Sequence, residues 1–135
     1  MNKSYFAKII AKDQQGLQMI SAYCSEANIK INEIKYLKKN KIFLLSLQRL
    51  SKEFDNNKKK INSILKFEYI YSSRSKNINQ NNADLIIELI AIDLFKRGHN
   101  YEIRLLFSNN AIITLNAEVI EVTLEDQKVL DDKNL

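Results

Sequence analysis

The chain has 135 residues, of which 45% are hydrophobic and 27% charged, and its net charge is +5. These values are typical of one globular domain with its own core, and they exclude a disordered chain. The single cysteine cannot form an internal disulfide, and the two glycines, Gly16 and Gly98, are too far apart for a glycine-rich phosphate loop. No apolar run reaches the roughly 18 residues of a membrane span, and the first residues lack a secretory leader pattern. We therefore expect a soluble cytoplasmic protein that does not enter a membrane.

The N-terminal segment predicts a strand followed by a helix. We predict a first strand from Tyr5 to Lys12, and Asp13 is a good helix N-cap because its carboxylate can accept free backbone N–H groups. An apolar stripe at spacings of three and four predicts a helix over 14–26; its members are Leu17, Ile20, Cys24 and Ala27. We expect Asn28 to end this helix, since asparagine tolerates the left-handed conformation.

Two strands with a lysine-rich turn come next. Residues 29–36 alternate with one slip, which indicates a strand with a bulge. A polar turn over 38–41, with Asn40 at positive φ, then leads into an apolar strand over 42–50. We expect these two strands to pair as a hairpin and the polar residues 51–60 to form a loop.

The second half predicts four more strands. They cover residues 64–72, 85–95, 101–107 and 111–124, with a flexible asparagine-rich linker over 73–82. Asn109 and Asn110 separate the last two strands at two-residue hairpin length, and both residues tolerate positive φ. We predict one α+β domain over residues 1–128 and an acidic C-terminal tail over 129–135.

This order favours an α+β, mainly β fold. Consecutive strands with short polar links predict an antiparallel meander of about seven strands with one N-terminal helix. Such a sheet forms a partly closed barrel or splits into two layers, and a pleckstrin-homology-like barrel is one concrete version. In that version residues 116–128 would form the capping helix instead of a strand.

Charge is unevenly distributed along the chain. Residues 1–76 hold 16 Lys and Arg against 6 Asp and Glu, a net charge of +10, and residues 77–135 hold 5 against 10, a net charge of −5. The candidate basic patch consists of Lys38, Lys39, Lys41, Lys58, Lys59 and Lys60. Polyanion binding, ordinary solubilising turns, attraction between the halves within one chain and self-association all explain this pattern.

The residues that carry chemistry are few. His99 is the only histidine and stands in a polar turn, whereas Cys24 lies on the apolar stripe of the helix, so neither predicts a catalytic or zinc site. Arg49 ends an apolar strand in a chain that otherwise prefers lysine, which indicates a specific carboxylate partner. Glu118 and Glu121, in the acidic half, are the predicted partners of Arg49 in a buried pair.

The chain resembles a family of uncharacterised proteobacterial proteins, the domain-of-unknown-function family 2948, over nearly its whole length. The residues that carry the resemblance are Asp13, Leu17, Ile20, Ser21, Ala22, Ala27, Tyr36, Leu37, Phe43, Leu47, Arg49, Leu89 to Ile92, Phe95, Ile112, Leu115, Glu118, Ile120, Glu121, Leu124 and Asp126. Four features expected of members are absent here: glycines at 109 and 110, an arginine near Ile113, a cysteine at 119 and a tryptophan near the C-terminus. Because this family has no assigned activity, the resemblance implies a compact cytoplasmic domain only.

Three functions stay open at this point. The preferred one is a non-enzymatic binding or scaffold domain that acts through protein contacts as a homodimer, with no cofactor or metal. The second is RNA or DNA binding through the basic patch. The third is a small-ligand pocket inside the barrel, lined by the polar strand residues Ser46, Gln48 and Thr114.

Overall fold

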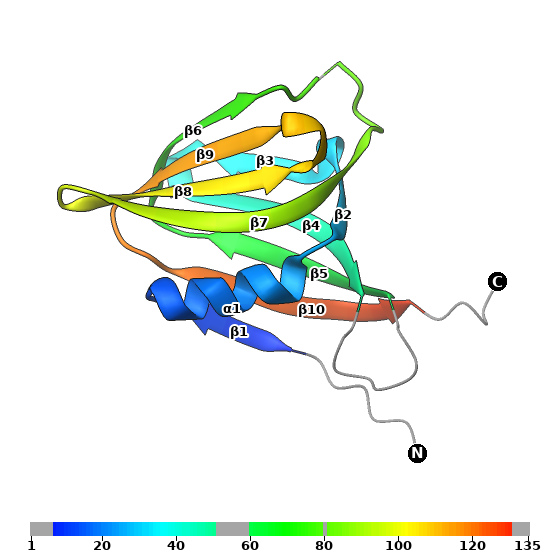
Figure 1. The fold of residues 1–135 in the computed structure, drawn as a ribbon, viewed down its shortest axis with the longest axis horizontal. Helices are drawn as coiled ribbons and strands as arrows, with labels where there is room; N and C mark the ends of the chain where they lie inside the picture. The colour runs from blue at the N-terminus through cyan, green and yellow to red at the C-terminus, as the bar shows by residue number, and fades with distance from the viewer. Residues whose placement is uncertain (1–6, 51–59, 80, 131–135) are drawn as a thin grey trace.

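A computed structural model describes residues 7–50, 60–79 and 81–130 of the chain. Within these residues there are ten strands, one α-helix and three short 3-10 helices (Figure 1). In chain order the elements are β1 (Lys8–Ala11), α1 (Gln14–Cys24), β2 (Ala27–Lys30), η1 (Ile31–Glu33), β3 (Ile34–Leu37), η2 (Lys38–Asn40), β4 (Ile42–Leu50), β5 (Lys60–Phe67), β6 (Ile70–Lys76), β7 (Ile86–Arg97), β8 (Asn100–Phe107), η3 (Ser108–Asn110), β9 (Ile112–Ala117) and β10 (Val122–Leu130). The α+β, mainly β class is confirmed.

The start of helix α1 agrees with the sequence, whereas its end does not. Asp13 has extended backbone angles, and its Oδ1 accepts the Gly16 N–H at 2.7 Å, so the predicted N-cap is confirmed. The helix stops at Cys24, and Glu26 adopts the positive φ of 70° that we expected of Asn28. Asn28 instead pairs in β2, because the hydrogen bonds of β2 with β7 compete with further helix turns.

The hairpin of β3 and β4 is confirmed, with Ile34 opposite Leu45 and Leu37 opposite Ile42. The predicted bulge before it is the short helix η1, which separates β2 from β3. In the turn, Lys41 rather than Asn40 takes positive φ. At the later turn both Asn109 and Asn110 have positive φ, as predicted.

Two long predicted strands are each divided in two. The segment over 64–72 breaks at Tyr69, which has a φ of 61°, and the segment over 111–124 breaks between β9 and β10. The two breaks lie together: Glu68 N donates to Glu121 O and Glu118 N donates to Tyr69 O, each at 3.0 Å. The alternative of a capping helix over 116–128 is therefore wrong, because this segment is strand and turn.

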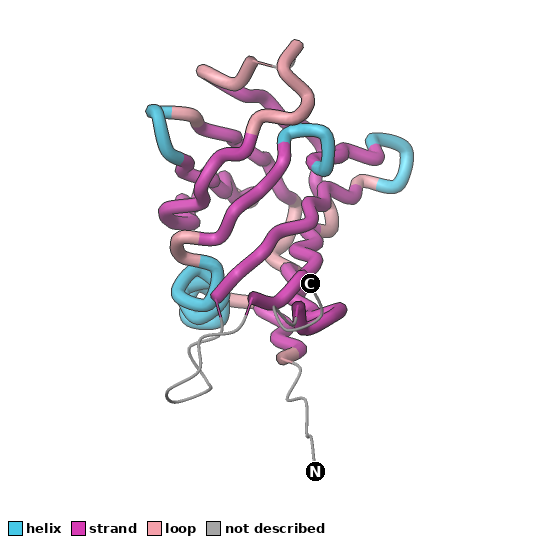
Figure 2. The backbone as a smooth tube through the Cα atoms, turned by 90° about the vertical axis from the view of Figure 1, so that its right-hand side faces the viewer, coloured by secondary structure: helices cyan, strands magenta, loops and turns pink. Residues whose placement is uncertain are grey.

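All ten strands join one antiparallel sheet in the order β1-β10-β5-β4-β2-β7-β8-β9-β6, with β3 on β4. The sheet bends so that its two halves face each other, and it does not close into a barrel (Figures 1 and 2). Helix α1 contacts β1 and β7 and covers the opening on that side. Strand β10 extends through Leu130, two residues into the segment predicted as a tail, and residues 131–135 lie outside the described part.

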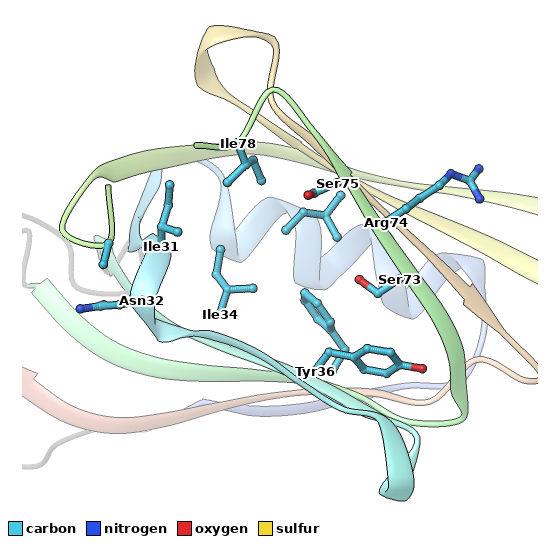
Figure 3. Close-up of a pocket in the computed structure, with 11 residues that line it drawn as sticks. Ile31, Asn32, Ile34, Tyr36, Ser73, Arg74, Ser75 and Ile78 are labelled. Atoms are coloured by element: carbon cyan, nitrogen blue, oxygen red, sulfur yellow. The ribbon is translucent and has the colours of Figure 1, made fainter. Parts of the chain in front are cut away.

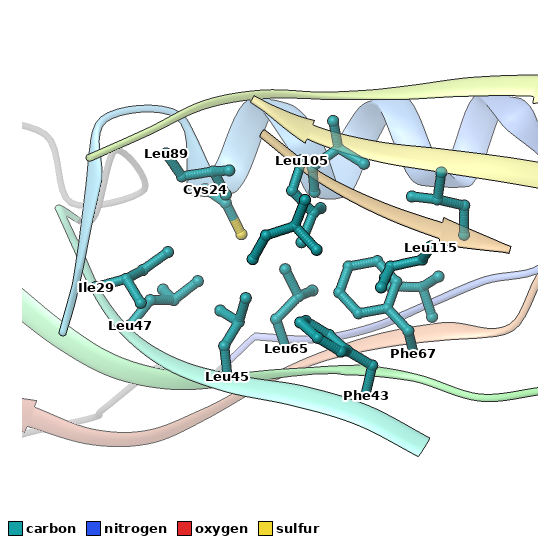
Figure 4. Close-up of a cluster of buried hydrophobic side chains, with 14 of the residues drawn as sticks. Cys24, Ile29, Phe43, Leu45, Leu47, Leu65, Phe67, Leu89, Leu105 and Leu115 are labelled. Carbon is teal, nitrogen blue, oxygen red and sulfur yellow. The ribbon is translucent and has the colours of Figure 1, made fainter. Parts of the chain in front are cut away.

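The hydrophobic core lies between the two facing halves of the sheet. Fully buried side chains come from both halves and from helix α1, and Figure 4 shows many of them together around Leu65 and Leu105. The buried stripe of α1 comprises Leu17, Ile20 and Cys24, as the apolar spacing predicts. Apolar side chains therefore occupy the space between the two halves of the sheet.

Candidate binding cleft

An open seam lies between β3 and β6, and it contains a cavity of about 430 Å³. Its walls are mostly apolar and come from η1, β3, β4, β6, β9 and the loop that follows β6. The lining residues are Ile31, Asn32, Ile34, Tyr36, Phe43, Ser73, Arg74, Ser75, Ile78, Ala83 and Ile113. A concave, mainly apolar cavity of this volume with a few polar groups is typical of binding sites. We call it the seam cleft.

Both ends of the seam cleft are closed by hydrogen bonds. At one end Ile70 N donates to Lys41 O at 2.9 Å, and the Tyr36 hydroxyl donates to Ile70 O at 3.0 Å. At the other end Asn32 N donates to Ala83 O at 3.0 Å, which attaches the loop after β6 to η1. The elements on either side of the seam cleft are therefore joined to each other at both of its ends.

Side-chain alternation on β6 separates two surfaces. Ser73 lies opposite buried Leu115 and Ser75 opposite buried Ile113, so both serines face inward. Arg74 lies on the outer face; Figure 3 shows its guanidinium pointing away from the cavity and the two serine hydroxyls pointing toward it. On the facing strand, Ile34 and Tyr36 point inward in the same way.

Both strands that flank the seam cleft are edge strands. Among the described residues β6 pairs only with β9, and β3 pairs only with β4. Every strand residue that faces such an edge carries a backbone N–H and C=O that no neighbouring strand satisfies. The seam cleft thus combines an apolar cavity with two rows of unpaired main-chain groups.

The described lysines of the predicted basic patch lie in two separate places. Lys38, Lys39 and Lys41 surround the turn at the closed end of the seam cleft, before β4 begins, whereas Lys60 lies opposite Leu50 at the far end of β4. The two places are therefore separated by the length of β4, whose nine residues span about 30 Å. Lys58 and Lys59 lie outside the described residues.

Arg49 is buried and forms an ion pair, as predicted, but its partner is Asp126. Its Nε donates to Oδ1 of Asp126 at 3.1 Å and its second terminal nitrogen to Oδ2 at 2.7 Å, while Ser63 and the Ala7 N–H also donate to this carboxylate. Burial acts to raise the pKa of Asp126, yet the hydrogen bonds from Arg49, Ser63 and Ala7 outweigh it and lower the pKa.

The predicted partners Glu118 and Glu121 lie elsewhere. Glu118 is half exposed and pairs with Lys41 at 3.3 Å, and Glu121 belongs to the turn between β9 and β10. Val122, Leu124 and Asp126 alternate along β10 and are all buried, so Asp126 points inward and Glu121 points outward. This alternation is visible in the sequence and favours Asp126 over Glu121 as the partner of Arg49.

Sequence reasoning missed a second charged cluster, around Glu102 on the outer face of β8. Arg104 donates to Glu102 at 2.6 Å, while Arg97 and Arg74 lie 3.5 Å and 4.0 Å from the same carboxylate. The hydrogen bond from Arg104 lowers the pKa of Glu102 more than burial raises it. These are three of the chain's four arginines, so lysine-rich composition does not explain their position.

The other candidate residues do not form a site. Thr114 faces outward between Arg104 and Arg74. Ser46 and Gln48 lie on the outer face of β4, where they line a separate pocket of about 390 Å³. The prediction that these three residues share a pocket inside a barrel is therefore wrong. His99 is exposed in the turn between β7 and β8. Burial raises the pKa of the Cys24 thiol to about 12, and a thiol with this pKa is a poor nucleophile at neutral pH.

Within residues 7–50, 60–79 and 81–130, His, Cys, Asp and Glu side chains form no group that could hold a metal ion. In the same part of the chain, no helix has the length and apolar character needed to cross a membrane.

Comparison with known proteins places the chain in a family. The model of the family described as "Protein of unknown function (DUF2948)" matches residues 7–132. The chain belongs to this family. Comparisons with curated proteins and with solved structures gave no match. Membership confirms the resemblance found in the sequence, and it covers the strands that form the seam cleft.

Proposed function

We propose that the chain is a non-enzymatic binding domain that takes an extended polypeptide segment into the seam cleft. The observation that carries this proposal is the pair of edge strands, β3 and β6, on either side of an apolar cavity. An extended segment can add to such an edge through main-chain hydrogen bonds, while its alternate side chains enter the cavity and provide specificity. Binding would satisfy the unpaired backbone groups and cover the apolar walls together.

The side chains that face the cavity suit a bound peptide better than an enzyme substrate. The polar side chains that face it are hydroxyls and an amide, from Ser73, Ser75, Tyr36 and Asn32. Such hydroxyl and amide groups are ordinary hydrogen-bond donors and acceptors for a bound peptide. The buried Cys24 thiol and the exposed His99 lie on other elements, α1 and the β7–β8 turn.

Selection from a library of random nonapeptides tests this function. The single buried cysteine makes labelling simple: Leu37→Cys introduces a thiol on the exposed outer face of β3 beside the seam cleft, and a solvent-sensitive dye on it reports occupancy without filling the cavity. We expect selected peptides to change the dye emission, and we expect shifts of backbone amide resonances to concentrate on β3 and β6. Amide shifts confined to other strands would contradict the proposal.

A matched pair of variants separates the seam cleft from a remote surface. Ser75→Trp places an indole in the cavity, whereas Lys96→Trp places the same group at an exposed position of β7 near α1. We expect the first variant to abolish binding of the selected peptides and the second to keep it. Equal binding by both would show that the peptide does not enter the cleft.

Self-association and the cytoplasmic location remain predictions. The partner segment could belong to a second copy of the chain, which analytical ultracentrifugation would detect as a concentration-dependent dimer. The cytoplasmic location is supported by the single buried cysteine, since no disulfide is possible within one chain.

A further inference from the structure

We propose that the segment bound in the seam cleft is acidic, with anionic side chains alternating with apolar ones. This inference rests on the proposed strand addition and names the chemistry of the partner. It follows from the charges that surround the cleft on its outer face, which the strand-addition proposal itself does not use.

The geometry of a paired strand fixes which residues would meet. Side chains directly opposite each other on neighbouring strands lie on the same face, about 5 Å apart. On the inner face of β6 a bound strand would meet Ser73 and Ser75 and the apolar cavity beside them. On the outer face the same strand would meet Arg74 and Lys76. Successive residues of the ligand therefore face apolar and cationic surroundings in turn.

Arg74 is available for a ligand anion. Its side chain is 66% exposed and lies 4.0 Å from Glu102, beyond hydrogen-bonding distance. Glu102 already accepts the 2.6 Å hydrogen bond from Arg104. A guanidinium has five N–H donors in a planar fork, which suits a carboxylate or phosphate group. Arg104, Thr114 and Arg74 lie side by side across β8, β9 and β6 on the outer face. An anionic side chain of a bound strand would lie next in this row, beside Arg74.

The opposite border of the seam cleft has the same sign of charge. On the elements that bound the cleft, six cationic side chains form a basic rim: Lys35, Lys38, Lys39, Lys41, Arg74 and Lys76. Acidic groups there are fewer: Glu33 on η1 and Asp84 in the loop are exposed, Glu118 pairs with Lys41, and Glu102 lies under Arg74. The rim keeps an excess of positive charge, and like charges opposite each other would disfavour a basic strand.

Three synthetic peptides test the inference on the full chain labelled at Leu37→Cys, outside the cavity. They share apolar residues at alternate positions and carry Glu, Gln or Lys at the positions between. We expect the Glu peptide to bind the labelled protein about tenfold more tightly than the Gln peptide, as two partly exposed ion pairs would provide. We also expect the Lys peptide to bind more weakly than the Gln peptide.

Charge reversal on β6 makes the test specific. In an Arg74→Glu, Lys76→Glu variant we expect the preference to invert, so that the Lys peptide binds best. A Lys12→Glu, Lys96→Glu control carries the same charge change near α1, remote from the seam cleft, and should keep the original preference. If the reversed variant is not folded by circular dichroism, the milder Arg74→Gln, Lys76→Gln variant should remove the preference.

The outcomes separate the two proposals. Equal affinity of the three peptides for the wild-type chain would overturn the acidic-partner inference and leave strand addition standing. A preference that persists unchanged in both the reversed and the neutralised β6 variants would also overturn it. Failure of all three peptides, together with failure of the random library, would overturn strand addition itself and the inference with it.

Discussion

The pair of Arg49 and Asp126 joins three strands through charged groups inside the core. Arg49 on β4 is 2% exposed and Asp126 on β10 is 7% exposed, and Ser63 on β5 donates to the same carboxylate at 2.6 Å. The Arg49 guanidinium also lies 5.2 Å from the centre of the Tyr23 ring on α1. A guanidinium cannot lose its proton in a protein, so its burial requires such an anion.

Removing one member of this pair should destabilise the domain strongly. We expect Arg49→Ala or Asp126→Asn to lower the free energy of unfolding by about 3–5 kcal/mol, because each breaks a buried, hydrogen-bonded ion pair and leaves the remaining charge uncompensated by the other member. Urea titration measures this, and Arg97→Ala, at an exposed arginine, is the control that should cost under about 1 kcal/mol. Additive effects in the Arg49→Ala, Asp126→Asn double mutant would show that the two side chains are not coupled.

The lowered pKa of Asp126 predicts how stability depends on pH. Because its pKa in the folded chain lies below the unfolded value of about 3.9, the carboxylate contributes full stability above that value. The contribution disappears as pH falls through the folded pKa, since protonation then favours the unfolded chain. We expect the urea midpoint to decline below about pH 4 and to decline less in Asp126→Asn. An equally steep decline in the variant would assign the effect to other carboxylates, Glu102 first among them.

At the scale of elements, α1 depends on a short contact with β1. Gly16 lies in the first turn, where an added Cβ would come within 3.0 Å of the Cα and Cβ of Ala11. The missing side chain therefore lets the helix approach the strand and cover the opening between β1 and β7. The N-cap at Asp13 fixes the same turn, because its side chain accepts the Gly16 N–H.

Loss of this cap should weaken the helix without changing the sheet. We expect Asp13→Ala to reduce the free energy of unfolding by about 0.5–2 kcal/mol, the usual cost of an N-cap aspartate. Gln15→Ala, at an exposed position two residues later, is the matched control and should be nearly neutral. Thermal unfolding followed by circular dichroism compares the two; equal melting temperatures would mean that the cap contributes nothing.

At the scale of the whole molecule, the two oppositely charged halves are interleaved. Acidic β10 lies between β1 and β5 of the basic half, and β7 pairs with β2. Among the described residues, three ion pairs cross the boundary between the halves: Lys41 with Glu118, Arg49 with Asp126, and Arg74 with Glu102. Attraction within one chain therefore accounts for much of the asymmetry that also motivated self-association.

This arrangement predicts how any self-association responds to salt. Because the charges of the halves are paired within one chain, we expect the sedimentation coefficient at fixed protein concentration to be the same in low and high salt. Analytical ultracentrifugation at both salt concentrations measures it. Larger species at low salt only would contradict this and point to an electrostatic dimer.

The sequence by itself determined the elements that local chemistry specifies. The N-cap at Asp13, the buried stripe of α1, the strand over 42–50 and the positive φ of Asn109 and Asn110 depend on neighbours a few residues away. The sequence also indicated that Arg49 needs a carboxylate partner, because a guanidinium stays charged when it is buried.

Only the tertiary structure decided where those elements meet. Alternation continues through Tyr69 and again between β9 and β10, so a period of two does not show that a strand has changed partners. The choice of Asp126, the gathering of three arginines at Glu102 and the seam cleft between β3 and β6 all join residues far apart in the chain. Pairing between distant strands fixes these contacts, and a local sequence pattern carries no information about which distant strand it will face.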